Sequence, residues 1–491
     1  MMNLTTDKKY KYLEDPSELA ELHEKTQKSG YRQAYHVQAV TGLINDPNGF
    51  SFFDGRWHLF YQWCPWGAVH GLKYWYHVVS EDLVNWRNLG IGLSPDEAYI
   101  YDNKGVYSGS GLPVGNELYL YYTGNNRDAE YIRHPYTCLA KMDKSGKIEK
   151  AAEPLFSEHP DYTEHQRDPK IVAFPDEEKY YIIIGTRTKD ERGCILIYEA
   201  TEPARGFRFK GELSVPGYEN FGGMWECPSI ECMVDKDVLI FCPQYLKLPG
   251  RGDGTNQNVY IVGKMDWENL TFTPAGDFHV LDEGFDFYAA ACANNTKDDR
   301  TILSAWMGLP DAAYPTDEED WSGCLTVPRE LSVKGDRLIK KPIRELVSLR
   351  EKEFDIGKGE IFKIPDACEI LMDVSSDSLL LRLFADENGE GGLLVAYDKA
   401  KKTLTVDRGH MKNVFNEKEG FVRTGELSDD LFSLRIFIDH SSLEIFANDG
   451  ELSFTSRVFP ADEEHFFNLN EGSVDVKGWL LKTSVDTKLV V

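Results

Sequence analysis

Three acidic residues lie at nearly equal spacing along the chain, each inside a short motif of its own. Asp46 lies in Asn-Asp-Pro-Asn-Gly, Asp168 in Arg-Asp-Pro, and Glu226 in Trp-Glu-Cys-Pro. Two carboxyl groups held close together can break a glycosidic bond, because one can act as a nucleophile and the other as a proton donor. The residue types therefore predict glycoside chemistry, provided that the fold brings these side chains together.

Taken alone, each motif has a plainer interpretation. Asn45–Gly49 is built of turn-forming residues, and Arg167 beside Asp168 fits a turn with a surface ion pair. Glu226 is harder to explain in this way, because it lies between Trp225 and a Cys-Pro pair, where an unpaired carboxylate is costly. Only the combination of the three motifs favours a functional site.

The combination follows from an internal repeat. Five segments share one plan, in which a turn-like opening and a short strand lead through a polar turn into a very apolar, aromatic strand. The equivalent positions are Asp46, Ser108, Asp168, Glu226 and Tyr288, at intervals of 62, 60, 58 and 62 residues. Such a period in β-rich sequence is typical of a β-propeller, and five repeats predict five blades of four strands.

The propeller hypothesis predicts where the acids lie. The innermost strand of every blade lines the central channel, so equivalent positions on successive blades face a common axis. We therefore expect the three carboxylates to meet in one funnel. His58 and His77 lie inside aromatic strands and are expected to be hydrogen-bonded structural histidines. The tryptophans are expected in the core, although some have the shape to stack against a sugar ring.

The segments on either side of the repeats complete the predicted architecture. Closely spaced strands with charged turns after residue 353 predict an antiparallel sandwich, and Pro16 and Ser17 before a Glu-rich run predict a helix start. The fold class is all-β, a five-bladed β-propeller followed by a C-terminal antiparallel β-sandwich. The predicted domains are an N-terminal helical extension at 1–32, the propeller at 33–340, a linker with a short helix at 341–352, and the sandwich at 353–491.

Composition excludes several classes of function. The net charge is 54 − 81 = −27, which disfavours nucleic acid and anionic lipid as partners. No run approaches the roughly 18 apolar residues of a membrane span. The polar N-terminus has no apolar secretory segment and the nine cysteines are scattered, so we expect a cytoplasmic protein. Cys227, Cys232 and Cys242 lack the spacing of a zinc site, and we expect no metal and no cofactor.

The ordered motifs resemble glycoside hydrolase family 32, which includes invertases, sucrose-6-phosphate hydrolases and fructanases. The resemblance covers almost the whole chain after residue 30. It rests on NDPNG (45–49), WHLFYQ (57–62), SGS (108–110), RDP (167–169), WECP (225–228), DFYAA (286–290), WMG (306–308), LTVPREL (325–331), SLEIFANDGE (442–451) and TSRVFP (455–460). One departure is Tyr76 in Trp75-Tyr76-His77, where many members have glycine, which bears on blade packing and not on the chemistry.

The resemblance implies a role for each motif residue. Asp46 is implied as the nucleophile, Glu226 as the general acid and base, and Asp168 as the group that stabilises the transition state. The implied reaction is a double displacement with retained configuration. The resemblance also implies a binding site for the fructosyl unit, formed by Leu43, Ile44, Asn45, Gln62, Ser108, Gly109, Arg167 and Trp306.

The implied substrate is a small sugar, and its identity stays open. Sucrose 6-phosphate, sucrose and short fructooligosaccharides all fit, as do two rival classes: a non-catalytic glycan-binding propeller and a five-bladed hydrolase of arabinan or xylan. A phosphorylated substrate needs basic groups at the glucose end of the pocket. Candidates on loops near the rim are Arg127, Arg133, His134, Arg187 and Arg251. The sequence does not indicate the oligomeric state.

Overall fold

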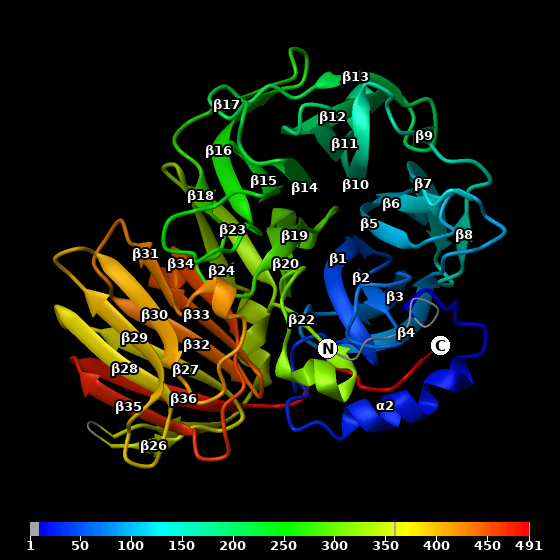
Figure 1. Ribbon diagram of the computed structural model, residues 1–491. Coiled ribbons are helices and arrows are strands. Elements are labelled where there is room, and N and C mark those ends of the chain that lie inside the picture. Colours follow the sequence, from blue (N-terminus) through cyan, green and yellow to red (C-terminus); the bar gives the residue numbers. More distant parts are fainter. Residues whose placement is uncertain (1–8, 358–359, 491) are drawn as a thin grey trace.

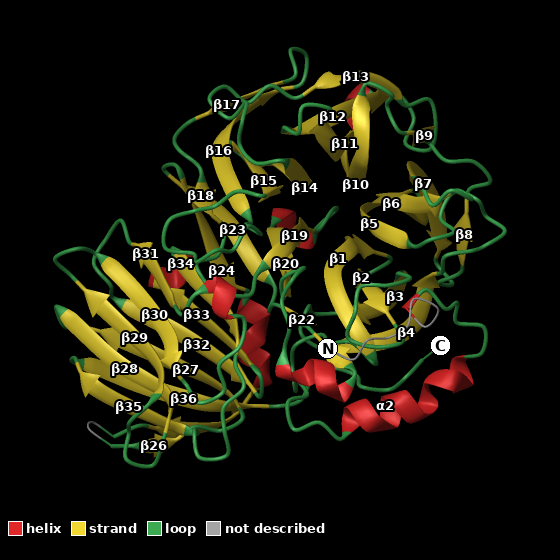
Figure 2. Cartoon of the chain, viewed as in Figure 1, coloured by secondary structure: helices red, strands yellow, loops and turns green. Residues whose placement is uncertain are grey.

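A computed structural model describes residues 9–357 and 360–490 and contains a ring of five sheets followed by a pair of stacked sheets (Figure 1). This confirms the predicted all-β class, with a five-bladed propeller followed by a β-sandwich. Neighbouring strands within each sheet are antiparallel, apart from one short parallel pair in the first blade. Helices are short and lie outside the sheets (Figure 2).

The five blades follow one another in chain order around the channel. The first blade has the strand order β21(Trp321–Ser322)-β1(Gly42–Phe53)-β2(Arg56–Cys64)-β3(Tyr74–Ser80)-β4(Trp86–Leu93). The second is β5(Val106–Val114)-β6(Glu117–Arg127)-β7(Arg133–Asp143)-β8(Ile148–Lys150), with β9(Phe156–Ser157) against β7. The third is β10(Tyr162–Phe174)-β11(Lys179–Thr188)-β12(Gly193–Ala200)-β13(Arg208–Glu212).

The last two blades have the same plan. The fourth is β14(Met224–Cys232)-β15(Asp237–Gln244)-β16(Val259–Asp266)-β17(Thr271–Pro274), with β18(His279–Val280) against β16. The fifth is β19(Tyr288–Cys292)-β20(Thr301–Met307)-β23(Arg329–Lys334)-β24(Arg337–Pro342), with β22(Cys324–Leu325) against β20. The parallel contact of β21 with β1 joins the end of the ring to its beginning.

Two six-stranded sheets form the sandwich. One has the order β25(Arg350–Asp355)-β36(Val474–Leu481)-β27(Ala367–Val374)-β32(Ser433–Asp439)-β33(Ser442–Ala447)-β34(Leu452–Arg457). The other has the order β26(Phe362–Lys363)-β35(Phe466–Glu471)-β28(Ser378–Ala385)-β29(Gly392–Asp398)-β30(Thr403–His410)-β31(Val422–Glu426). Buried and partly buried residues alternate along most of β28 and β30, as expected for strands with one face in the core.

The helical segments match the sequence signals. In η1(Pro16–Leu19) the Asp15 carboxylate accepts a hydrogen bond from Ser17 N, and α2(Ala20–Gln27) follows directly. The predicted linking helix is η5(Arg344–Leu349), one 3₁₀ segment between the two units. The other 3₁₀ turns are η2(Pro175–Glu177), η3(Lys297–Asp299), η4(Pro315–Glu319), η6(Glu417–Glu419) and η7(Asn448–Gly450). The exact domain boundaries stay a prediction.

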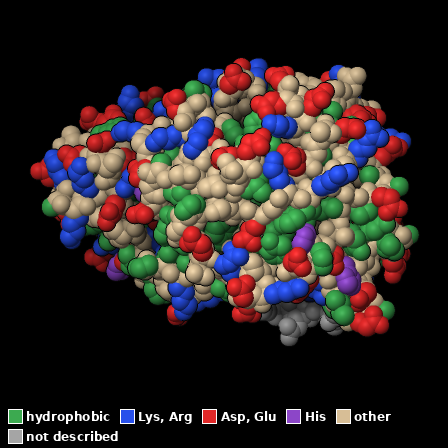
Figure 3. Space-filling view, turned by 90° about the horizontal axis from the view of Figure 1, so that it is seen from above, with side chains coloured by type: hydrophobic (Ala, Val, Ile, Leu, Met, Phe, Trp, Pro, Cys, Tyr) green, Lys and Arg blue, Asp and Glu red, His purple; other side chains and the backbone are tan. Residues whose placement is uncertain are grey.

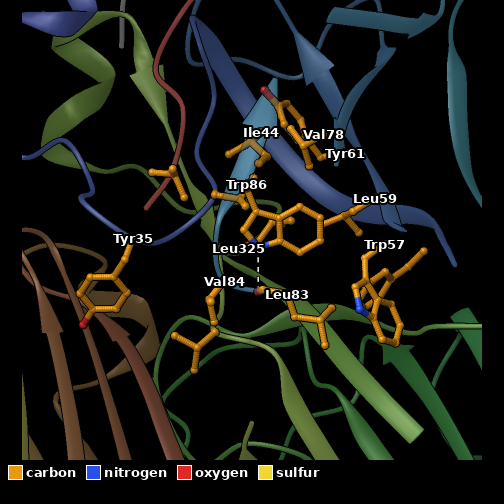
Figure 4. Close-up of a cluster of buried hydrophobic side chains, with 14 of the residues drawn as sticks. Tyr35, Ile44, Trp57, Leu59, Tyr61, Val78, Leu83, Val84, Trp86 and Leu325 are labelled. Atoms are coloured by element: carbon orange, nitrogen blue, oxygen red, sulfur yellow. Dashed lines mark hydrogen bonds between the residues drawn. The ribbon is translucent and has the colours of Figure 1, made fainter. Parts of the chain in front are cut away.

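The first blade packs on the largest apolar cluster, which draws residues from the N-terminal segment, the fifth blade and the sandwich. Figure 4 shows Trp57, Leu59 and Trp86 converging there, with the Trp86 indole donating to the Leu83 carbonyl at 2.9 Å. Burial of each such side chain stabilises the fold by roughly 1.5–3 kcal/mol. Tyr76, the departure from the family pattern, also belongs to this cluster, and its hydroxyl donates to the Val490 carbonyl at 2.9 Å. Tyr76 therefore anchors the C-terminal tail to the first blade.

A buried charged network joins the propeller to the sandwich. Arg329 of β23 is fully buried and contacts Asp282 at 2.8 Å and Glu444 of β33 at 2.6 Å. His36 contacts Glu444 and Asp439 at 3.0 and 2.8 Å. Removing one member of such a network leaves an uncompensated buried charge, at a cost of roughly 3–5 kcal/mol. The network therefore fixes how the sandwich sits against the ring.

Candidate active site

Every innermost strand carries a β-bulge at the position that repeats in the sequence. The strand pairing is interrupted between Ile44 and Pro47, Tyr107 and Gly109, Arg167 and Lys170, Glu226 and Ser229, and Tyr288 and Ala291. A bulge bends the strand and redirects one side chain. Asp46, Ser108 and Asp168 lie within these bulges, whereas Glu226 and Tyr288 are the last paired residues before them. The two turn-like motifs, Asn45–Gly49 and Arg167-Asp168-Pro169, are thus strand segments, and their interpretation as isolated turns is wrong.

The innermost strands bring the three acids close together. The Cys227 thiol lies 3.9 Å from Asp46 Oδ2 and 3.6 Å from Asp168 Oδ2, so it bridges the two aspartates. Cys227 N also donates to Asp168 Oδ2 at 3.0 Å. Glu226 precedes Cys227 on β14, and the charges of Glu226 and Asp46 both act on Asp168, so the three carboxyl groups lie close together.

Asp46 is oriented by donors on both of its oxygens. Asn45 Nδ2 donates to Oδ1 at 2.9 Å, and the Ser108 hydroxyl donates to Oδ2. Gln62 supports both donors, because its Oε1 accepts from Asn45 at 2.6 Å and its Nε2 donates to Ser108 Oγ. An ionised carboxylate is an acceptor only, and this arrangement holds it as one. Such a carboxylate is suited to nucleophilic attack.

Lys73, which the sequence analysis did not select, lies behind this group. Its Nζ donates to Asn45 Oδ1 at 2.9 Å and to Gln62 Oε1 at 2.7 Å, and the residue is only 6 % exposed. Because it saturates both amide oxygens, Lys73 fixes which way the two amides face. The one signal in the sequence is a lysine at the start of the otherwise apolar run that becomes β3.

Glu226 is held from two sides. Arg167 donates to its Oε1 through Nε at 3.0 Å and through Nη2 at 2.6 Å, while the Tyr288 hydroxyl donates to Oε2. Tyr288 is the fifth repeat position, and the sequence alone indicates no role for it. Arg167 precedes Asp168 in the chain, and its Nε lies 4.0 Å from Oδ2 of that residue. Its main partner is Glu226.

Asp168 is the most deeply buried of the three acids. Burial, and beyond it the charges of Glu226 and Asp46, raise the pKa of Asp168 to about 7, against the lowering effect of Arg167. The backbone at Asp168 is left-handed, with φ of 66°, because this residue forms the bulge. A carboxyl group shifted this far by neighbouring acids is typical of a functional site.

The other predicted binding residues divide into two groups. Gly109 N donates to Asn48 Oδ1 at 2.8 Å, and an added Cβ at Gly109 would lie 1.9 Å from the Tyr121 carbonyl oxygen. Trp306 is 2 % exposed, its Nε1 has no partner among the described residues, and it packs with Leu43 and Tyr288 near the acids. Ile44 instead lies in the hydrophobic cluster of the first blade (Figure 4), so only its backbone is left for a binding role.

The sequence predictions also concern two histidines and the absence of a metal site. His58 Nδ1 and His77 Nε2 lie 3.0 Å apart inside the first blade, and burial lowers the pKa of His58 to about 4. They form a structural pair away from the carboxylates. Within residues 9–357 and 360–490, no cluster of three or more His, Cys, Asp or Glu side chains suits a metal ion. In the same segments no helix is long and apolar enough to cross a bilayer.

Comparison with known proteins gives matches over nearly the whole chain. The model described as the glycosyl hydrolases family 32 N-terminal domain matches residues 36–342, and the family 32 C-terminal model matches residues 350–483. A sucrose-6-phosphate hydrolase of Staphylococcus xylosus is 36 % identical, with 99 % of each chain covered. One of Lactococcus lactis subsp. lactis is also 36 % identical, covering 98 % of this chain and 100 % of the relative.

Solved structures agree with these matches. The sucrose-6-phosphate hydrolase of Lactobacillus gasseri superposes with a TM-score of 0.92 at 32 % identity, covering 98 % of this chain and all of that one. A family 32 β-fructofuranosidase of Bombyx mori superposes with a TM-score of 0.84 at 29 % identity, covering 96 % and 99 % of the two chains. Both likenesses extend over the ring and the stacked sheets together.

Proposed function

The chain belongs to glycoside hydrolase family 32, and we propose that it is a retaining β-fructofuranosidase that hydrolyses the terminal β-D-fructosyl bond of sucrose 6-phosphate or sucrose. The resemblance seen in the motifs is confirmed. The observation that carries the proposal is the meeting of Asp46, Asp168 and Glu226 at equivalent bulges, with donors on both oxygens of Asp46 and of Glu226.

The proposed reaction starts with Asp46. Its carboxylate attacks the anomeric carbon of the fructosyl unit while Glu226 gives a proton to the departing glucosyl oxygen. The products of this step are a fructosyl ester on Asp46 and the free glucosyl sugar. Glu226 then removes a proton from water, which attacks the ester, and Asp46 leaves again as a carboxylate. Two displacements at one carbon retain its configuration.

Asp168 stabilises the transition state in this scheme. The fructosyl unit passes through an oxocarbenium-like state, and a negative carboxylate close to it lowers the barrier. Asp168 also has the geometry to accept hydrogen bonds from fructose hydroxyls. Arg167 and Tyr288 keep Glu226 in place during both proton transfers. The proposed contacts to the fructosyl unit come from Asn45, Gln62, Ser108, Gly109 and Trp306, and from the backbone of Leu43 and Ile44.

Location and domain limits are further parts of the proposal. All nine cysteines are free thiols in the structure, which agrees with a reducing compartment and supports a cytoplasmic enzyme. Acidic and basic side chains are interspersed over the face seen in Figure 3, so the charge of −27 is not gathered there into one acidic patch. The proposed domains are 1–32, 33–340, 341–352 and 353–491, as predicted.

The first experiment compares kcat/KM for sucrose, sucrose 6-phosphate and a short inulin-type oligosaccharide on the purified protein. We expect cleavage of sucrose or its 6-phosphate. No cleavage of any of the three would contradict the proposed function and would favour a glycan-binding propeller. A nitrophenyl arabinoside tests the rival hydrolase class and should stay intact.

The roles of the two central acids are separable. Asp46→Asn and Glu226→Gln should each lower kcat for sucrose by several orders of magnitude. In kcat/KM, which reports the first displacement, Glu226→Gln should lose much less on a nitrophenyl fructoside, whose leaving group needs no proton, whereas Asp46→Asn should stay inactive on both. Glu231→Gln, on the same strand and 3.2 Å from Lys170, is the matched control and should behave like the parent. Near-parent sucrose activity in Asp46→Asn or Glu226→Gln would contradict the assignment.

A further inference from the structure

Basic side chains extend outward from Glu226 along one side of the site. Arg167, which holds Glu226, also donates through Nη1 to His165 Nδ1 at 3.2 Å. The side chain of Arg167 is 13 % exposed, that of His165 is 28 % exposed, and that of Arg187 is 19 % exposed. The site therefore opens toward solvent past His165, and His165, Arg133 and Arg187 are called the rim cluster below.

The rim cluster comes from three strands. Arg133 begins β7, His165 lies in β10, and Arg187 lies near the end of β11, where its carbonyl accepts from the Thr163 hydroxyl at 2.8 Å. Burial lowers the pKa of His165 to about 4, and the positive charges of Arg167, Arg133 and Arg187 add to the shift. Three guanidinium groups thus act on one imidazole, and one of them, Arg167, contacts it directly.

The positive charge of the cluster is poorly neutralised. Among the described residues Arg133 has no ion-pair partner, and Arg187 pairs only with Glu191, whose side chain is 76 % exposed. The Nε atoms of Arg133 and Arg187 are buried without any hydrogen-bond partner in the same set. A buried N–H group without a partner is costly, and a ligand bound beside it would supply the missing acceptor. A ligand for this set is an anion.

His165 adds a donor to the two guanidinium groups. Its Nδ1 accepts from Arg167, so in the neutral imidazole the proton is on Nε2. That nitrogen is 3.5 Å from Glu164, a side chain 52 % exposed and readily displaced. Two arginine forks and an N–H donor match the three terminal oxygens of a phosphate monoester.

The other rim candidates have partners already. His134 contacts Asp128 at 3.0 Å and Glu158 at 3.1 Å. Arg251 contacts Glu283 at 2.6 Å, beside the buried network that joins the ring to the sandwich. Arg127 donates to the Tyr131 carbonyl at 2.8 Å. Two of the five candidates, Arg133 and Arg187, therefore stay available, and the structure adds His165.

We propose that Arg133, Arg187 and His165 bind the 6-phosphate of the glucosyl unit, so that the physiological substrate is sucrose 6-phosphate. This inference rests on the proposed function, because it needs the glucosyl oxygen to face Glu226. Arg167 links Glu226 to His165, so the cluster lies on the side where the leaving group departs.

The test is the ratio of kcat/KM for sucrose 6-phosphate to kcat/KM for sucrose. One charge-assisted hydrogen-bonding group contributes roughly a factor of ten to a hundred. Arg133→Gln and Arg187→Gln should each lower the ratio about tenfold or more, and the double variant about a hundredfold or more. Sucrose turnover in the same samples reports whether the variants are folded. Arg205→Gln, an exposed arginine paired with Glu202 at 2.8 Å, is the control and should keep the parent ratio.

A second measurement needs no turnover. Glucose 6-phosphate should bind the parent protein about tenfold or more tightly than glucose in calorimetric titration, and the double variant should bind the two equally. Inorganic phosphate is the third ligand titrated. It should bind more weakly than glucose 6-phosphate if the rim cluster recognises a sugar phosphate. Equal ratios in the parent, the double variant and Arg205→Gln, or equal binding of glucose and its phosphate to the parent, would overturn the phosphate site. If the parent protein cleaves none of the sugars, that result would instead contradict the proposed function.

Discussion

Lys73 offers the sharpest test of how the site orients its nucleophile. The hydrogen bonds run in one direction: Lys73 donates to the amide oxygens of Asn45 and Gln62, Asn45 donates to Asp46, and Gln62 donates to Ser108, which donates to Asp46. If an amide rotates by half a turn, it presents an oxygen where it had presented an N–H group. Lys73 prevents this, because an ammonium group can only donate.

The cost of removing that constraint follows from these contacts. In Lys73→Met, Asn45 Oδ1 loses the donor that held it at 2.9 Å, and a buried acceptor without a partner costs roughly 1–3 kcal/mol. Rotation of the Asn45 amide relieves that cost but removes the N–H group from Asp46. Loss of one hydrogen bond to a charged group is worth roughly 1.5–3 kcal/mol. We therefore expect kcat/KM for sucrose to fall between about tenfold and about 150-fold.

The assay is steady-state hydrolysis combined with a double-mutant cycle. If Lys73 acts through Asn45, then Lys73→Met should cost far less in an Asn45→Ala background than in the parent. Lys340→Met is the matched control, because Lys340 is also buried, at 3 % exposure, but donates to the Glu451 carbonyl far from the acids. It should lower stability and keep kcat/KM within about threefold of the parent. A Lys73→Met enzyme within the same threefold, or strictly additive effects in the cycle, would refute the orienting role.

Two predictions concern pH. Burial and neighbouring acids raise the pKa of Asp168 to about 7, so kcat/KM for sucrose, which has no phosphate to titrate, should fall as the pH drops through that value. Asp168→Asn should be far less active, and its kcat/KM should not show this acidic fall. The same fall in the variant would assign it to another group. Burial alone would lower the pKa of His36, but hydrogen bonds to Asp439 and Glu444 and their charges raise it to about 9, above the unfolded value of 6.5. This contribution of about 3 kcal/mol is therefore fully present below pH 6.5 and is lost as the pH rises to 9. In urea unfolding, His36→Gln should lack that loss, and an equal pH dependence in both proteins would exclude His36 as its source.

The fold was predictable because the repeat is regular. A spacing near 60 residues and aromatic strands led to five blades, and the alternating pattern after residue 353 led to the sandwich. The closure of the ring through β21 and the anchoring of the C-terminal tail by Tyr76 were not predictable. Both depend on pairing between segments hundreds of residues apart, for which a single sequence has no local signal.

The site was predictable only in part. The repeat placed Asp46, Asp168 and Glu226 on one axis, since blades put equivalent residues at equivalent heights. It did not show that Arg167 holds Glu226 instead of Asp168, nor that Lys73 lies under the amides. Those facts depend on side-chain directions between neighbouring strands and blades, and differences of a few ångströms decide them.

The bulges explain why turn-forming residues and catalytic residues coincide in this chain. A bulge leaves a backbone N–H group without a strand partner, and each of these groups donates to a side chain of the preceding blade: Gly109 to Asn48, Asp168 to Thr123, Cys227 to Asp168 and Ala290 to Asn258. The same device that turns each side chain toward the channel thus fastens each blade to the one before it. A substitution that straightens one bulge would therefore move an acid and weaken a contact between blades at the same time. Such a variant should lose stability and activity together.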